Sequence, residues 1–171
     1  MKQNLSEWGS FYWVIPVVVI SLLIVFLFDR SKFKKPGLAL LLILWSSAVL
    51  YLMFLYRLPA GKGKIITTPF HMYREAQRYS GSIATNQSLR QILFNMLLFV
   101  PLGAILTSLT HRPWLAVAVG ILISVIAELL QYWSGLGWAD IDDVISNTLG
   151  LLLGVLIFLL YRVIATRMYR E

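Results

Sequence analysis

The sequence predicts an all-α fold, a polytopic integral membrane helix bundle, and three observations lead to this fold class. Of the 171 residues, 58% are hydrophobic and only 13% are charged, whereas soluble domains contain about half apolar and a quarter charged residues. The apolar residues form runs of roughly 18 to 20 residues, enough to cross a bilayer at ~1.5 Å per residue. Charged residues are concentrated between these runs. A soluble globular domain is therefore excluded.

We expect about five transmembrane helices. The predicted spans are residues 11–28, 38–56, 86–109 and 114–133, and a last span that begins at Asp140. Asn86 is expected to cap the third span. We divide the chain into residues 1–64, two N-terminal spans that anchor or scaffold the rest, and residues 65–171, a three-span core with the loop that precedes it.

The connection between the second and third spans, residues 57–91, is long for a compact protein. Such loops are usually functional or have structure of their own. Thr68 and Pro69 are typical first residues of a helix, and Gly81 can end one. A short helix lying in the membrane interface fits this pattern. A solvated basic loop is the alternative interpretation.

The last two predicted spans carry polar stripes at helical spacing. In the fifth span, the stripe consists of Asp140, Asp143, Asn147, Gly150 and Gly154. In the fourth span, it consists of Gly120, Ser124, Ala127, Glu128 and Gln131. Ionisable groups inside a span are costly and usually face a bundle interior or a polar cavity, and small residues allow helices to approach closely. We expect both stripes to face inward and, with Arg90 and Asn95, to line one cavity.

The composition also limits the possible chemistry. The chain has no cysteine, which excludes disulfides, thiolate metal sites and cysteine nucleophiles. The net charge of +7 comes from basic residues that flank the spans, so anionic lipid is a better partner than nucleic acid. His71 and His111 stand alone on different loops, and we expect both to be surface residues. No cofactor is expected; a divalent cation on Asp140, Asp143 and Glu128 is the alternative, because hard cations take oxygen ligands.

Five spans place the two termini on opposite sides of the membrane. With the N-terminus outside, eight Lys and Arg residues lie inside and seven outside, six of them in the long loop. Without that loop the ratio is eight to one, and short segments decide orientation best. We therefore predict an outer N-terminus, a cytoplasmic C-terminus, and an outer position for the long loop and the acidic turn.

Several groups of residues resemble the VanZ-like family in their order and spacing. They are Thr68-Pro69-Phe70, then Arg90 with Asn95, then Phe99-Val100-Pro101-Leu102-Gly103, then Glu128-x-x-Gln131, then Asp140-x-x-Asp143-x-x-x-Asn147-x-x-Gly150. The resemblance covers residues 65–155 and leaves the first span outside the pattern. It implies a protein of the bacterial cytoplasmic membrane, because the founding member is associated with reduced susceptibility to teicoplanin. Many relatives carry an arginine before the position of Asp140, where this chain has Gly137-Trp138-Ala139.

Each polar group also has a purely structural interpretation. Glu128 would tie helices together if it were protonated or paired with an arginine such as Arg90. Asp140, Asp142 and Asp143 would cap the last helix and favour its dipole. In this hypothesis the chain is a structural bundle or a partner subunit. Capping does not account for Asn147, which lies a turn deeper in the span.

Two functional hypotheses remain beside the structural one. In the first, the chain binds a lipid-linked cell-wall precursor or a glycopeptide in an outer-leaflet pocket, with membrane lipids as further partners. The predicted ligand-binding residues are Arg90, Asn95, Glu128, Gln131, Asp140, Asp143 and Asn147. In the second, the chain is a membrane enzyme acting on a lipid phosphate or glycolipid headgroup, with Glu128 or Asp143 as general acid or base. The sequence shows no evident nucleophile for such an enzyme.

Overall fold

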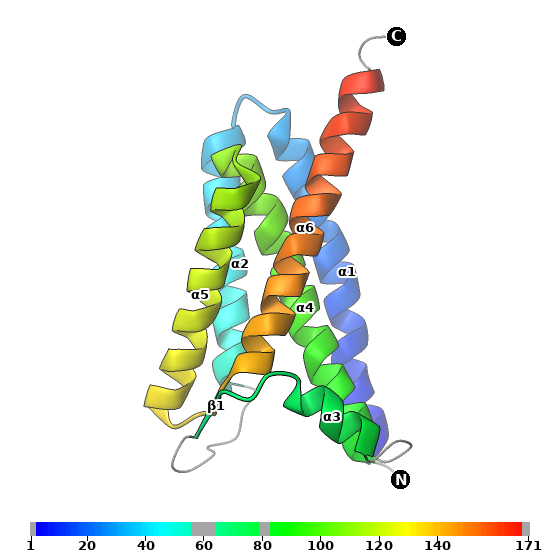
Figure 1. The fold of residues 1–171 in the computed structure, drawn as a ribbon. Helices are drawn as coiled ribbons and strands as arrows, with labels where there is room; N and C mark the ends of the chain where they lie inside the picture. The colour runs from blue at the N-terminus through cyan, green and yellow to red at the C-terminus, as the bar shows by residue number, and fades with distance from the viewer. Residues whose placement is uncertain (1–2, 56–63, 79–82, 169–171) are drawn as a thin grey trace.

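The structure, a computed structural model, describes residues 3–55, 64–78 and 83–168, which form six helices and two short strands (Figure 1). The elements are, in order, α1 (Gln3–Asp29), α2 (Lys34–Leu55), β1 (Ile65–Ile66), α3 (His71–Arg78), α4 (Ile83–Thr110), α5 (Pro113–Ser134), β2 (Ala139–Asp140) and α6 (Ile141–Met168). α1, α4 and α6 begin at the end of the bundle where α3 lies, and α2 and α5 run the opposite way (Figure 1). We call this end the α3 end.

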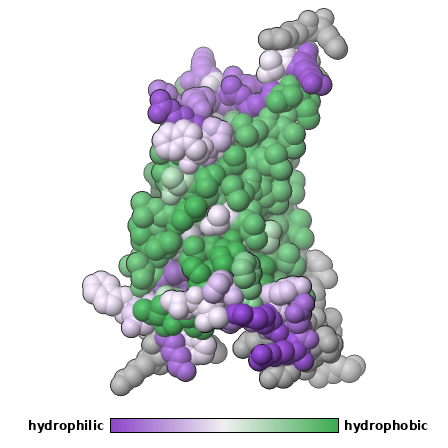
Figure 2. Space-filling model, in the orientation of Figure 1, coloured by the Kyte–Doolittle hydropathy of each residue, from purple (hydrophilic) through white to green (hydrophobic). Residues whose placement is uncertain are grey.

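The helices have the length and composition of membrane spans, which confirms the predicted fold class. Four of them, α2, α4, α5 and α6, are long and apolar enough to cross a bilayer, and α1 contributes the apolar segment Trp13–Asp29. Figure 2 shows an apolar band around the middle of the molecule, with hydrophilic residues at both ends. The outward-facing side chains of this band include Leu122, Leu152 and Leu160, as expected for a surface in contact with lipid.

α4 is the central helix, because it contacts each of the other five. Its packing against α6 depends on glycines in both helices. A Cβ on Gly150 would overlap the carbonyl oxygen of Met96, and one on Gly154 would overlap that of Val100. A Cβ on Gly103 would likewise overlap the carbonyl oxygen of Leu151. The two backbones therefore approach too closely for any side chain, as the glycine stripe predicts.

The predicted inward face of α5 is also confirmed. Its buried residues are Ala116, Gly120, Ser124, Ala127, Glu128 and Gln131. The helix ends at Gly135, which has a φ of 69° and donates its backbone N–H to the carbonyl of Tyr132. Glycine adopts this left-handed conformation without strain and so ends helices well. The chain can then turn back sharply into β2 and α6.

At the opposite end, one carboxylate joins four helices. Asp29, the last residue of α1, accepts bonds from Lys34 Nζ at 2.5 Å and from Ser108 Oγ at 2.8 Å. Arg162 Nη1 lies 3.2 Å from its second oxygen. These contacts connect α1 to α2, α4 and α6. We call this end, which also carries Arg30 and Arg112, the basic end.

Two predicted helix starts differ from the structure. α4 begins at Ile83, three residues before Asn86, so Asn86 is not its cap. The short predicted helix exists as α3, but it begins at His71 and not after Thr68. Its start is set by a carboxylate from another element, described below. Gly81, expected to end this helix, lies outside the described residues.

Candidate functional site

The long loop is held against the start of α6 by a short parallel sheet. Ile65 pairs with Ala139 and Ile66 pairs with Asp140. The backbone N–H of Ala139 also donates to the carbonyl of Lys64 at 3.0 Å. Because of this pairing, residues 64–78 pack beside the acidic turn, although they are some 70 positions earlier in the chain.

Asp140 is held in place by both its backbone and its side chain. Its backbone N–H donates to Glu128 Oε2 at 3.1 Å, so the end of α5 is joined to the start of α6. Its Oδ1 accepts the backbone N–H of Asp142 at 2.9 Å. Asp140 is therefore the N-cap of α6, the role that sequence reasoning allowed for one of the acids.

Asp142 caps a different helix from its own. Its Oδ1 accepts the backbone N–H of Phe70, and its Oδ2 accepts that of Met72 at 2.8 Å. Phe70 immediately precedes α3 and Met72 is its second residue, and N–H groups at the start of a helix have no partner within the helix. Phe70 has a φ of 60°, a conformation uncommon for a large side chain. The buried carboxylate of Asp142 thus fixes where α3 begins and how it is attached.

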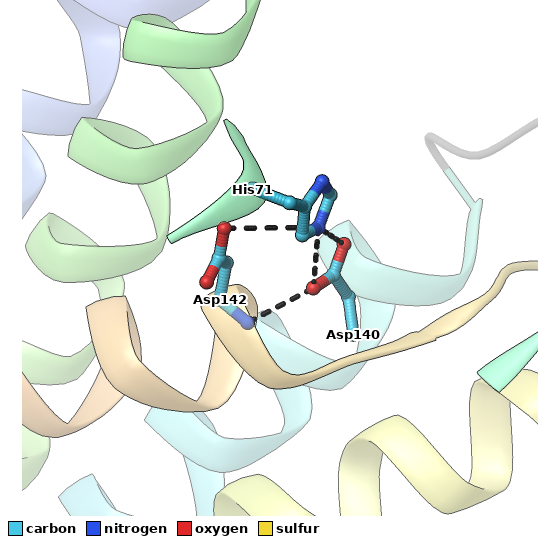
Figure 3. Close-up of side chains that lie close together, drawn as sticks. All are labelled: His71, Asp140 and Asp142. Carbon is cyan, nitrogen blue, oxygen red and sulfur yellow. Dashed lines mark hydrogen bonds and ion pairs between the residues drawn. The ribbon is translucent and has the colours of Figure 1, made fainter. Parts of the chain in front are cut away.

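His71 completes a cluster with these two aspartates (Figure 3). Its Nε2 lies 2.8 Å from Asp140 Oδ2, 3.0 Å from Asp140 Oδ1 and 3.7 Å from Asp142 Oδ2. The prediction that His71 is an isolated surface residue is therefore wrong, because β1 and α3 carry it onto the acidic turn. The side chain of His71 is 21% exposed, whereas those of Asp140 and Asp142 are 7% and 6% exposed. The other histidine, His111, is exposed at the basic end, as expected.

Asp143 lies beneath this cluster and is bound by amides of α4. Its Oδ1 accepts Asn95 Nδ2 at 2.6 Å, and Gln91 Nε2 donates to both carboxylate oxygens at 3.0 and 3.2 Å. Arg90 is half-buried next to Gln91 on the same helix. Because Asp143 is fully buried, these charge-assisted bonds replace hydration that the carboxylate loses.

The deepest polar contact joins α5 to α6. Asn147 Nδ2 donates to Ser124 Oγ at 2.9 Å, and both residues are fully buried. Gln131, also fully buried, lies two turns further along the same face of α5. The polar residues therefore form a continuous buried region from the bundle interior to the α3 end. The structure brings together the predicted residues Asn95, Glu128, Gln131, Asp140, Asp143 and Asn147 in this region.

The surface around His71 is both aromatic and basic. Phe70 and Tyr73 are largely exposed, as are Arg74 and Arg78 of α3. Lys64 Nζ lies 5.4 Å from the centre of the Trp138 ring, within range of a cation–π interaction. Aromatic and basic side chains are typical of a membrane–water interface. The composition of α3 is therefore that of an interfacial helix, as predicted.

The residues that could hold a metal differ from the set considered on sequence. In the described part of the chain, the group with ligand atoms within 4.8 Å of one another consists of His71, Asp140 and Asp142. The set considered earlier contained Asp140 with Asp143 and Glu128. Asp143 instead binds the amides of α4, and Glu128 binds the backbone of Asp140.

Sequence reasoning left three residues of this region out of the predicted site. Gln91 follows Arg90 and lies one turn before Asn95, so helical spacing could have identified it. Asp142 was assigned only to the capping and the dipole of its own helix. His71 carried no signal at all, because its contact depends on the register between β1 and β2.

The fold and the site define a multi-pass helical membrane protein with a histidine–aspartate cluster at one end of its bundle. The profile of the VanZ/LLP1 family matches residues 17–162, and the chain belongs to this family. It is thus a VanZ-like membrane protein, of a family linked to teicoplanin resistance.

The matched range extends the resemblance recognised in residues 65–155. It begins at residue 17, inside α1, and so includes most of the first span, which had been left outside the family pattern. No curated protein and no solved structure matches the chain. The division into residues 1–64 and 65–171 stays a prediction.

Proposed function

We propose that this protein binds the polar headgroup of a lipid-linked cell-wall precursor, or a glycopeptide, at the α3 end of the bundle. The α3 end would face the outside of the bacterial cytoplasmic membrane, with the N-terminus outside and the C-terminus in the cytoplasm. Binding there would contribute to lipoglycopeptide resistance. The observation that carries the proposal is His71, the accessible group of an otherwise buried polar region.

The surroundings of His71 suit an anionic, amphipathic ligand. Lys64, just before β1, and Arg74 and Arg78 of α3 are exposed, and they can attract phosphate or carboxylate groups. Phe70 and Tyr73 provide exposed aromatic surface beside them. A lipid-linked glycan combines a phosphate, hydroxyl groups and an apolar chain, so it can use all of these contacts.

The buried residues would act on the ligand indirectly. Asp140 and Asp142 orient the imidazole of His71, and Glu128 holds the backbone of Asp140. Asp143, with Gln91 and Asn95, supports the turn from below. In this proposal, His71 and the basic residues contact the ligand, while the predicted residues Glu128, Gln131, Asp143 and Asn147 maintain the shape of the site.

A binding measurement with one matched pair of variants tests this proposal. The wild-type protein, His71→Asn and His111→Asn would be placed in nanodiscs and titrated with the lipid-linked disaccharide–pentapeptide precursor and, separately, with teicoplanin. We expect His71→Asn to weaken binding of one of these probes at least about tenfold, since a hydrogen bond to a charged group contributes roughly 1.5–3 kcal/mol. His111→Asn changes an exposed histidine at the basic end and should bind like the wild type.

Two results would contradict the proposal. One is that the wild-type protein binds neither probe. The other is that His71→Asn and His111→Asn bind equally well while both remain folded. Teicoplanin susceptibility of cells that make equal amounts of each variant should follow the same order.

One observation favours a second function, a membrane enzyme acting on a lipid phosphate. The sequence showed no evident nucleophile. In the structure, the imidazole of His71, paired with Asp140, can act as a general base that activates water as the nucleophile. His71 would take a proton from water as the water oxygen attacks phosphorus, and the bond from phosphorus to the lipid oxygen would break. That oxygen would leave as the lipid alcohol after taking a proton from solvent, and His71 would return its proton to solvent. Glu128 and Asp143, the earlier candidates for this role, are buried among helices.

Phosphate release distinguishes the enzyme from the binding protein. The wild-type protein would be incubated with a polyprenyl phosphate, and inorganic phosphate measured over time. The enzyme hypothesis predicts release that His71→Asn abolishes and His111→Asn preserves. If the wild-type protein binds the lipid but releases no phosphate, the enzyme hypothesis is excluded and only the binding function remains.

A further inference from the structure

We infer that His71, Asp140 and Asp142 form a binding site for one divalent transition-metal ion, such as Mn²⁺ or Zn²⁺. One imidazole and two carboxylates are a mixed set of nitrogen and oxygen ligands. Such sets suit first-row divalent ions, because imidazole favours zinc and iron while carboxylates favour manganese. The histidine is the first residue of α3, and the two aspartates lie at the end of β2 and in the first turn of α6.

The spacing of the ligand atoms fits a single ion. His71 Nε2 lies 2.8 Å from Asp140 Oδ2 and 3.7 Å from Asp142 Oδ2. Ligands about 2.1 Å from a metal, at angles of roughly 90–110°, lie about 3.0–3.4 Å from each other. Figure 3 shows both carboxylates turned toward the same ring nitrogen of His71. All three groups have ligand atoms within 4.8 Å of one another, so shifts on the order of an ångström or less at each side chain would bring them onto one ion.

The balance of charge points in the same direction. The side chains of Asp140 and Asp142 are both more than nine-tenths buried. Within the described part of the chain, His71 is the only basic side chain that forms an ion pair with either of them. Two carboxylates carry a charge of −2, and a protonated imidazole supplies at most +1. Buried charges are normally paired or bound to metals, so a divalent cation would complete the compensation.

The contacts already made by the carboxylates leave room for the ion. Each carboxylate has about four acceptor positions. Asp142 uses two of these for the backbone N–H groups of Phe70 and Met72, and Asp140 uses one for the N–H of Asp142. These backbone bonds would orient the metal ligands, as outer partners commonly do in metal sites. Three protein ligands leave positions open for water or for an oxygen of a bound molecule.

Metal binding is inferred from the spacing, burial and charge of His71, Asp140 and Asp142 and does not depend on the proposed function. A role for the ion in holding a phosphate or another headgroup oxygen rests, in addition, on the function proposed above. The two can therefore fail separately, and metal content is measured without any headgroup ligand.

The first test is the metal stoichiometry of purified full-length protein in nanodiscs. The protein would be stripped with a chelator, loaded with Mn²⁺ or Zn²⁺, freed of excess metal and analysed by elemental mass spectrometry. We expect about one ion per chain for the wild type and for His111→Ala. His71→Ala and Asp140→Asn should lose at least about 100-fold in affinity, since even outer partners of a metal site are worth 10- to 100-fold.

The second test keeps His71, Asp140 and Asp142 unchanged, so it does not depend on a variant at the site. Pulsed electron paramagnetic resonance of Mn²⁺-loaded wild-type protein should show coupling to one imidazole nitrogen. His111→Ala should retain this coupling, which would assign it to the remaining histidine, His71.

Two outcomes would overturn the inference. One is that the wild-type protein keeps less than about a tenth of an ion per chain, and the other is that bound Mn²⁺ shows no nitrogen coupling. Headgroup binding that persists in chelator-stripped protein would leave the proposed function intact while excluding a role for the metal in it. A wild-type protein that binds the metal but does not bind the headgroup would contradict the proposed function and leave the metal site intact.

Discussion

Asp142 is the residue that attaches α3 to the bundle. Its two carboxylate oxygens accept free backbone N–H groups at the start of α3, from Phe70 just before the helix and from Met72 in its first turn. No side chain of α3 itself caps these groups in the described structure. The position of His71, the residue between the two donors, therefore depends on Asp142 as well as on the sheet between β1 and β2.

Asp142→Ala should release α3 without unfolding the bundle. It removes two hydrogen bonds to a charged group, each contributing roughly 1.5–3 kcal/mol. Backbone amides of residues 70–74 should exchange with deuterium at least tenfold faster, while those of α4 and α6 stay protected. Gln77→Ala is the control, because Gln77 is exposed on the same helix and bonds only to the hydroxyl of Tyr73. Equal exchange in the two variants would show that Asp142 does not hold α3.

Single residues also show where sequence reasoning stops. Asn95, Asp143 and Asn147 were placed in one polar region correctly, because helical spacing decides which face of its own helix each residue occupies and polar faces turn toward the bundle interior. His71 was placed at the surface, because the long loop has no periodicity that would bring it to the turn. The start of α3 was misplaced, because a preference of about 1 kcal/mol for Thr68 as a cap is weaker than two bonds to Asp142.

At the level of elements, the contact between α4 and α6 organises the bundle. Gly150 and Gly154 face the carbonyl oxygens of Met96 and Val100, and these are backbone atoms that cannot move aside independently. The sequence predicted a close helix contact at these glycines, because they continue the stripe of Asp143 and Asn147, but it did not identify α4 as the partner. It also predicted the inward face of α5. Both predictions succeeded because a helix repeats its faces regularly, which an irregular loop does not.

Two glycine-to-alanine variants should differ in stability although they make the same chemical change. Gly154→Ala places a methyl group against the backbone of Val100, whereas Gly120→Ala places one against the end of the Leu151 side chain, which can rotate. Overpacking costs about 1–3 kcal/mol where neighbours cannot yield. We expect Gly154→Ala to lower the midpoint of unfolding in detergent clearly more than Gly120→Ala. The reverse order would contradict the close contact of α4 with α6.

At the level of the whole molecule, the two ends of the bundle have different chemistry. Among the described residues, the basic end carries Arg30, Lys34 and Arg162 around the carboxylate of Asp29. The α3 end carries Asp140, Asp142 and Asp143 beneath an exposed surface of aromatic and basic groups. Positive charge in short segments favours the cytoplasmic side of a membrane. This asymmetry is the physical basis for the prediction that the α3 end faces outward.

The orientation can be measured with introduced cysteines, since the chain has none of its own. Thr67→Cys lies at the α3 end and Lys35→Cys at the basic end, and both positions are exposed. In intact cells, a membrane-impermeant maleimide should label Thr67→Cys at once and label Lys35→Cys only after lysis. The opposite pattern would place the α3 end in the cytoplasm, where it could not meet an outer-leaflet ligand.

The most direct test of a headgroup site at the α3 end is photocrosslinking in living cells. A benzophenone amino acid would replace Tyr73, which is exposed on α3, or Trp114, which is exposed at the basic end. The account predicts that the probe at position 73 captures the lipid-linked cell-wall precursor, detected by mass spectrometry, and that the probe at position 114 captures only bulk phospholipid. Capture of the precursor at position 114, or at neither position, would contradict it.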